Sequence, residues 1–186
     1  LEGDDVIEIG LTPNRNDAMG HWGVARDLRA GLLHGTVDGV GPMEVNELRL
    51  PAMAQLDNAL ARGGNLSLNV DAKYDCPHYL ALELEDVKVG PSPEWAQKQL
   101  RAIGLQPINN VVDATNLVLH EFGNPLHAFD MEQIGGSQIR VRKAKQGEAF
   151  TTLDGQARKL DAQDLVIADR DKPMCLAGVY GGADSG

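Results

Sequence analysis

Polar side chains interrupt an otherwise apolar stretch at residues 112–130. On a helix, Asp113 and Asn116 share one face because they lie three positions apart, and Thr115 lies on a neighbouring face. Asp and Asn are mediocre helix formers, since their side chains compete with the backbone for hydrogen bonds. Their use here indicates a specific hydrogen-bonding task. Two tasks fit: holding a ligand or a water, or capping the helix and bracing the loop that follows it.

A histidine and two pairs of small residues extend the set of candidate groups. His127 follows Pro125 in a short extended segment, and its neutral imidazole can donate at one nitrogen and accept at the other. That suits binding a ribose hydroxyl or assisting a water, although a structural histidine remains the alternative. Ala177-Gly178 and Gly181-Gly182 lie at and beyond a predicted strand end. Glycine lets a ligand approach the backbone, and it equally allows a tight turn or close sheet packing.

The sequence contains no pattern typical of a metal site or a redox centre. No histidine pair has the spacing of a zinc motif, so we expect no metal site. Cys76 and Cys175 lie far apart, and we interpret them as reduced thiols of a cytoplasmic protein. A phosphate-binding glycine motif and a serine nucleophile elbow are both missing from the sequence.

The charge balance limits the possible partners. The chain has 186 residues, with 17 Lys and Arg against 27 Asp and Glu, which gives a net charge of −10. The overall electrostatic field of such a chain repels the phosphates of nucleic acid. Nucleic-acid binding would therefore need a local basic patch or other parts of a larger protein. No apolar run approaches the ~20 residues of a membrane span, and we predict no membrane association.

The pattern of elements changes near residue 65. Before it, we predict a strand at 6–9, a turn at 12–17, and a helix at 18–34 that ends at Gly35. Residues 36–64 have weak periodicity and are predicted to be a linker, with a possible short helix at 53–61. Both ends look cut, because the chain opens on Leu1 and closes on a glycine-rich run.

After residue 65, strand patterns dominate. Alternation predicts strands, and helix signals at Ser92-Pro93 and Gly123 predict two helices. The predicted strands are 66–70, 80–84, 139–143, 149–153, 165–168 and 174–179, and the predicted helices are 93–103 and 111–122. Asp154-Gly155 predicts a hairpin turn. Because strands and helices do not alternate regularly, we predict an α+β fold with a mostly antiparallel sheet and two or three helices.

Four ordered blocks resemble the β subunit of bacterial phenylalanyl-tRNA synthetase. They are Glu8-Ile9-Gly10-Leu11-Thr12-Pro13-Asn14-Arg15-Asn16-Asp17 continuing to Leu28, the stretch Asp113 to Asp130, Leu153-Asp154-Gly155, and Leu165 to Gly182. The resemblance implies that residues 1–35 are the second half of a small split helical domain. It further implies that 65–186 are the editing module, truncated at its C-terminal end.

The resemblance also implies a function. In that family the editing module hydrolyses tyrosine wrongly attached to tRNA(Phe), within an enzyme that ligates phenylalanine to the same tRNA using ATP. The family's Thr-Asn pair, histidine and Ala-Gly strand end line the editing pocket. They match Thr115, Asn116 and His127, expected in catalysis, and Ala177 and Gly178, expected to bind the tyrosyl group.

Further expectations concern the parent enzyme. The resemblance implies an α subunit, tRNA(Phe) and mischarged Tyr-tRNA as partners, and ATP with magnesium for the parent, with no cofactor in this segment. A tyrosine-reading glutamate of the family lies beyond Gly186, so the isolated chain is expected to be inactive. The alternative is a structural or tRNA-docking module of the same synthetase without hydrolytic function. A free-standing editing factor is disfavoured by the cut ends.

Overall fold

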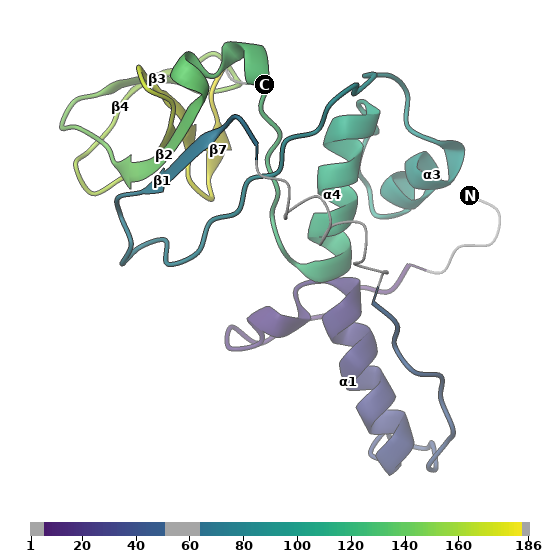
Figure 1. Ribbon diagram of the computed structural model, residues 1–186. Coiled ribbons are helices and arrows are strands. Elements are labelled where there is room, and N and C mark those ends of the chain that lie inside the picture. Colours follow the sequence, from purple (N-terminus) through teal and green to yellow (C-terminus); the bar gives the residue numbers. More distant parts are fainter. Residues whose placement is uncertain (1–5, 51–63, 184–186) are drawn as a thin grey trace. The chain divides into compact units, whose positions relative to one another are not determined.

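The computed structural model describes residues 6–50 and 64–183. They form two compact units. Unit 1 combines the described residues of Leu1–Ala52 with Lys88–Leu126, and unit 2 combines those of Met53–Val87 with His127–Gly186. The described helices α1, α3 and α4 belong to unit 1 and the strands to unit 2, which confirms the α+β prediction (Figure 1). The predicted division at residues 35 and 65 stays a prediction. Within these ranges, no helix combines the length and apolar character that crossing a membrane requires.

Helix α1 spans His21–His34 and follows a 3-10 turn at Asn16–Ala18. The α-helix begins three residues later than predicted, because Gly20 is extended (φ −139°, ψ 164°) and separates it from the 3-10 turn. It ends as predicted at Gly35, which adopts the left-handed conformation (φ 63°) that glycine reaches without a Cβ clash.

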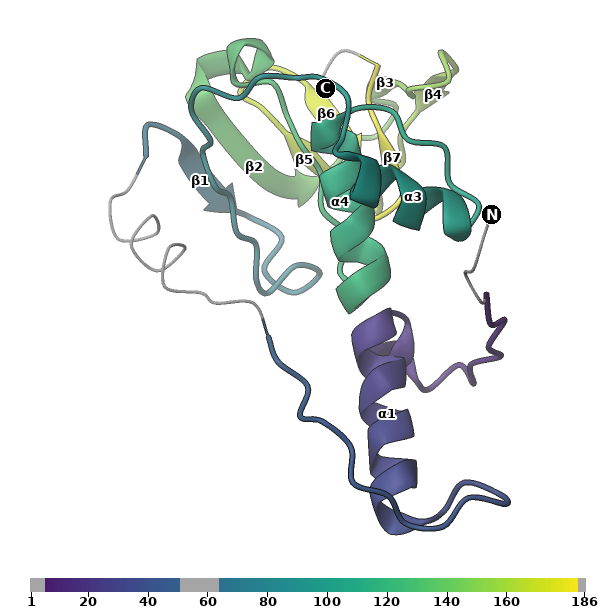
Figure 2. The ribbon, with the colours of Figure 1, turned by 90° about the vertical axis from the view of Figure 1, so that its right-hand side faces the viewer.

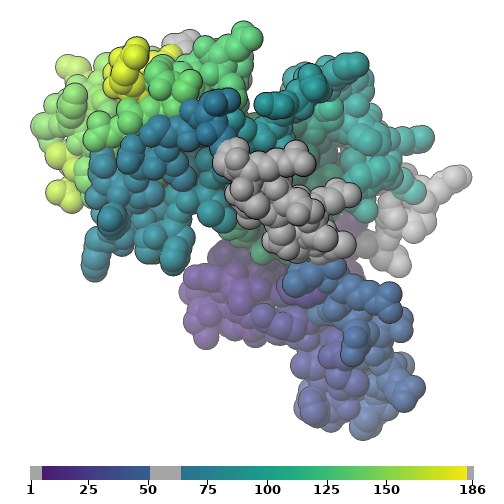
Figure 3. Space-filling view, viewed as in Figure 1, coloured from purple at the N-terminus to yellow at the C-terminus, as the bar shows by residue number. Residues whose placement is uncertain are grey.

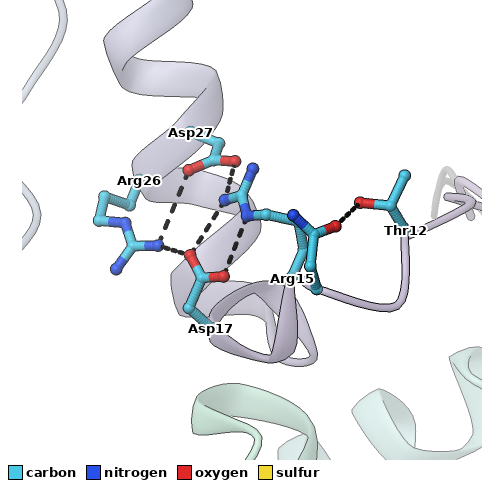
Figure 4. Close-up of polar contacts among 6 residues, drawn as sticks. Thr12, Arg15, Asp17, Arg26 and Asp27 are labelled. Carbon is cyan, nitrogen blue, oxygen red and sulfur yellow. Dashed lines mark hydrogen bonds and ion pairs between the residues drawn. The ribbon is translucent and has the colours of Figure 1, made fainter.

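Four charged side chains tie the turn before α1 to the helix itself (Figure 4). Arg15 pairs with Asp17, with Nε 3.0 Å from Oδ1, and also with Asp27. Arg26 pairs with the same two carboxylates. The hydrogen bond from Arg15 lowers the pKa of Asp17 to about 2. The network is balanced in charge and exposed, so it orders the turn without creating a basic patch.

Helices α3 (Glu94–Ala102) and α4 (Asn110–Phe122) complete unit 1. The start of α1 meets the end of α4, as both ribbon views show (Figures 1 and 2). A Cβ on Gly20 would lie 2.5 Å from the Gly123 nitrogen, so only glycine allows this approach of the two backbones. His21 Nδ1 lies 2.8 Å from the His120 carbonyl oxygen. This contact gives His21 a structural role.

A five-stranded sheet with the order β1-β2-β5-β6-β7 forms the centre of unit 2. Its strands are β1 (Ser67–Val70), β2 (Gln138–Lys143), β5 (Leu165–Ala168), β6 (Pro173–Leu176) and β7 (Tyr180–Gly181). Among the strands of the described residues, only the β1–β2 pairing is parallel, so the predicted mostly antiparallel sheet is confirmed. Figure 3 shows the blue segment that carries β1 lying beside the green β2 edge. A separate hairpin, β3 (Ala149–Thr151) with β4 (Ala157–Lys159), turns at Asp154-Gly155 as predicted.

Two buried clusters hold this sheet together. Strand β5 contributes to both, because Ile167 faces one side of the sheet while Val166 and Ala168 face the other. The first cluster is Ile134, Ile139, Val141, Ile167, Met174 and Cys175. The second is Ala144, Phe150, Leu160, Val166 and Ala168. Phe129 packs against the first cluster from the segment before β2.

Three strand predictions need correction. Residues 6–9 and 80–84 are not strands, and the predicted strand at 174–179 ends at Leu176, where a hairpin turn begins. Leu80 and Leu84 remain largely exposed, at 86% and 67%. Alternation alone cannot make a strand, because a strand also needs a neighbour for its backbone hydrogen bonds. The predicted helix at 53–61 lies outside the described residues.

Candidate functional site

Helix α4 positions the first two predicted site residues. Asn109 caps its start, and its side-chain oxygen accepts hydrogen bonds from the amides of Val111 (3.0 Å) and Val112 (2.9 Å). Gly123 ends the helix in the left-handed conformation (φ 74°). The helix is therefore fixed at both ends, so the side chains that it carries have defined directions.

Thr115 and Asn116 are half-buried neighbours on α4. The Thr115 hydroxyl donates to the Val112 carbonyl oxygen at 2.7 Å, so its hydrogen is committed and its oxygen remains available as an acceptor. Within the described chain, the Asn116 side chain makes no hydrogen bond. This amide therefore keeps both donor and acceptor capacity. Together the two residues offer the groups needed to hold an ammonium or a water.

Asp113 is structural. Its carboxylate is 1% exposed, and it accepts hydrogen bonds from the Ser92 hydroxyl and from the Ile108 amide at 2.8 Å. Ser92 was predicted to cap α3, but its hydroxyl is used by Asp113, and Pro93 occupies the cap position. The bracing alternative for the polar residues of this stretch therefore holds for Asp113.

His127 lies in unit 2, in the irregular segment between α4 and β2. The residue as a whole is exposed, yet its ring packs edge-on against Phe129, with centroids 4.6 Å apart. A Cβ on Gly181 would lie 2.9 Å from its Cε1 atom, so the ring also lies directly against that glycine. The resulting loss of water lowers the pKa of His127 below its usual value near 6.5. The neutral ring, able to donate and to accept, is thus favoured at pH 7.

Ala177 and Gly178 form the hairpin turn between β6 and β7. The Ala177 amide donates to the Leu165 carbonyl oxygen at 2.9 Å, so it is not available to a ligand. Gly178 adopts φ 71°, which favours glycine, and its amide has no acceptor among the described residues. Of the pair, Gly178 supplies the available N–H.

The structure brings some predicted residues together and separates others into different units. Thr115 and Asn116 are adjacent in unit 1. In unit 2 the ring of His127 lies against Gly181, three residues after Gly178. The close contact of His127 with Gly181 was missed at the sequence level, although Gly181-Gly182 had been noted for its small side chains. The alternation of His127 and Phe129 in an extended segment would have indicated that their rings share a side.

The basic cluster of β2 is neutralised by neighbouring carboxylates. Each of its three cations has an acidic partner at 2.6–3.2 Å: Arg140 with Asp71, Arg142 with Glu148, and Lys143 with Asp75. Across the described ranges, no three His, Cys, Asp or Glu residues are placed to hold a metal ion. A cavity of about 160 Å³ opens between β3 and β6. Gly182, one of the small candidate residues, lines it, whereas Thr115, Asn116, His127, Ala177 and Gly178 do not.

Comparison with known proteins identifies the family. Residues 75–186 match the B3/4 domain family, and the chain belongs to it. The whole chain is 47% identical to the phenylalanine–tRNA ligase beta subunit of Porphyromonas gingivalis and 44% identical to that of Anaeromyxobacter dehalogenans. It is 44% identical over 98% of its length to the same subunit of Bacillus cereus. The chain spans only 21–22% of the length of these relatives. The resemblance to the β subunit of phenylalanyl-tRNA synthetase is confirmed.

Proposed function

We propose that this chain is the post-transfer editing module of a phenylalanine–tRNA ligase, hydrolysing tyrosine from mischarged tRNA(Phe). One observation carries the proposal: the B3/4 family match at 75–186 contains all five predicted site residues. The parent would ligate phenylalanine to tRNA(Phe) with ATP and magnesium in the cytoplasm, together with an α subunit. The relatives' printed names, phenylalanine–tRNA ligase beta subunit, support this assignment.

The need for a second site follows from selectivity. A synthetic pocket shaped for phenylalanine rejects tyrosine poorly, since an apolar pocket discriminates by only about 10² against an isostere that adds a hydroxyl. A pocket that hydrogen-bonds the phenol does better, because phenylalanine would leave its buried polar groups unpaired at about 1–3 kcal/mol each. Hydrolysis of the activated ester then needs mainly a positioned water and donors for the developing oxyanion.

The hydrogen bonds of the two units suggest a division of roles. Thr115 would accept from the tyrosyl ammonium group, because its own hydrogen is already donated to Val112. Asn116 would hold the same group or the attacking water through its amide. His127 would contact the terminal ribose or the water as a neutral ring, in keeping with its lowered pKa. The Gly178 amide would donate to the tyrosyl moiety.

A second candidate is a structural module without hydrolytic function. Asp113 favours it, because the most buried polar group of the stretch accepts hydrogen bonds from Ser92 and Ile108 inside unit 1. The tRNA-docking version of this candidate is weaker, since the basic residues of β2 are paired with carboxylates.

The two candidates differ in how single substitutions act on the full α–β enzyme. Thr115→Ala and His127→Ala should each raise the accumulation of Tyr-tRNA(Phe) and leave phenylalanine charging near normal. His34→Ala is the matched control, because His34 is an exposed histidine at the end of α1. Equal losses of charging and editing would support the structural candidate instead.

A further inference from the structure

We propose that Phe129 is a positioning residue that holds the imidazole of His127 in its working orientation. The inference rests on the proposed function, in which His127 contacts the ribose or the water. The two rings meet edge-on, with centroids 4.6 Å apart and planes inclined by 63°. Aromatic pairs favour this geometry, because the positive edge of one ring faces the negative face of the other.

Phe129 can act as an anchor because it belongs to the core. It is partly buried and packs against the cluster that includes Ile139 and Met174. His127 and Phe129 are only two positions apart, and their rings are in direct contact, so the core-packed ring of Phe129 lies beside the imidazole. The segment is fixed immediately afterwards, because Asp130 accepts a hydrogen bond from the Glu132 amide at 3.0 Å and caps a 3-10 turn.

Gly181 provides the second contact of the ring. A Cβ at this position would lie 2.9 Å from His127 Cε1 and 3.4 Å from Nε2. The imidazole therefore occupies the space that a side chain at position 181 would need. The described contacts thus restrict the ring by Phe129 and by Gly181, although the residue as a whole is exposed.

This arrangement matters because His127 makes no hydrogen bond within the described chain that would fix its ring. The side chains of a catalytic site must be held within about 0.5 Å of their productive positions, by neighbours whose own rotamers are locked by packing. Phe129 meets that requirement, since its ring is held by the core. Removing the ring should therefore leave His127 in place in the chain but distributed over several rotamers.

The experiment uses the full α–β enzyme and replaces Phe129 in three ways. Phe129→Leu and Phe129→Met keep an apolar side chain in the core and remove the aromatic edge, whereas Phe129→Tyr keeps the ring. Val70→Ala is the control for stability, because Val70 packs against the same cluster. Single-turnover deacylation of Tyr-tRNA(Phe) should fall roughly two- to tenfold in the Leu and Met variants, the factor that an edge-to-face contact supplies. The Tyr and Val70→Ala variants should keep the parent rate.

Two further readouts separate positioning from general stability. In Phe129→Leu/His127→Ala, deacylation should be no slower than in His127→Ala alone, because Phe129 acts through the imidazole. Carbethoxylation of His127 by diethyl pyrocarbonate, followed by peptide mass mapping, should be faster in Phe129→Leu than in the parent. Parent-like deacylation by both the Leu and Met variants, or additive losses in the double variant, would overturn the proposal. If His127→Ala itself keeps the parent rate, the proposed role of His127 in editing fails, and the carbethoxylation rate alone decides whether Phe129 positions the ring.

Discussion

Replacing Asp113 by Ala is predicted to destabilise unit 1 strongly. The carboxylate is 1% exposed and accepts from the Ser92 hydroxyl and the Ile108 amide. Alanine would leave both donors without their acceptor, at about 1–3 kcal/mol for each buried unsatisfied group. Since the Ser92 hydroxyl can rotate toward another acceptor, the expected loss in the free energy of unfolding is about 2–5 kcal/mol.

Asp113→Asn should cost less. Its amide oxygen can still accept from Ile108, and its NH₂ group can donate to the Ser92 hydroxyl oxygen. The remaining loss is the charge-assisted share of the two hydrogen bonds, about 1 kcal/mol. A graded series of parent, Asn and Ala is therefore expected.

Urea unfolding of the 186-residue chain, followed by tryptophan fluorescence, measures this series. The sequence has two tryptophans, Trp22 and Trp95, and both belong to unit 1, so the signal reports the unit that contains Asp113. Asp38→Ala is the control, because Asp38 is exposed, and it should stay within about 0.5 kcal/mol of the parent. An Asp113→Ala midpoint equal to that of the control would refute the structural role of this carboxylate.

Three other predictions follow from ion pairs and close approaches. The double substitution Asp71→Asn with Asp75→Asn should free two cations of β2 from their carboxylates. In a fluorescence titration the chain should then bind tRNA more tightly and with a steeper salt dependence. Unchanged binding would contradict the claim that these carboxylates neutralise the basic residues of β2. The hydrogen bond from Arg142 is the main reason that the pKa of Glu148 is lowered. The stability that this carboxylate adds is therefore present above its usual pKa near 4.5 and is lost as the pH falls below that value. Urea midpoints between pH 6 and pH 3 should fall less in Glu148→Gln than in the parent, and parallel curves would refute this. Gly20→Ala should lower the free energy of unfolding by more than about 1 kcal/mol in the fluorescence assay, because the new Cβ would lie 2.5 Å from the Gly123 nitrogen. A parent-like midpoint would show that the backbones at Gly20 and Gly123 can move apart at no cost.

Local signals in the sequence predicted much of the secondary structure. Gly35 and Gly123 end their helices in the left-handed conformation, and Asp154-Gly155 turns a hairpin. These features depend on a few neighbouring residues, so the sequence contains what is needed to predict them. The segment at 80–84 shows the opposite case. Its alternation is that of a strand, but strand formation depends on a distant neighbour that the local pattern does not specify.

The candidate site was predictable in residue identity and less so in hydrogen-bond detail. Asp113 and Asn116 look alike in sequence, yet Asp113 is used by Ser92 and Ile108 while Asn116 keeps its hydrogen-bonding capacity. Only the packing of the loop before α4 decides between them. The contact of His127 with Gly181 joins positions 54 residues apart, a separation that no local pattern reveals.

The central claim is hydrolysis of tyrosine from tRNA(Phe), and single-turnover deacylation of preformed Tyr-tRNA(Phe) tests it most directly. The full α–β enzyme carrying His127→Ala would be compared with the parent and with His34→Ala. We predict at least a roughly tenfold slower release of tyrosine in the His127 variant, since a positioned water or ribose contact contributes that much or more to such a reaction. Phenylalanine charging by the same preparation should match the parent. A His127→Ala enzyme that releases tyrosine at the parent rate would contradict the assignment of editing to this histidine.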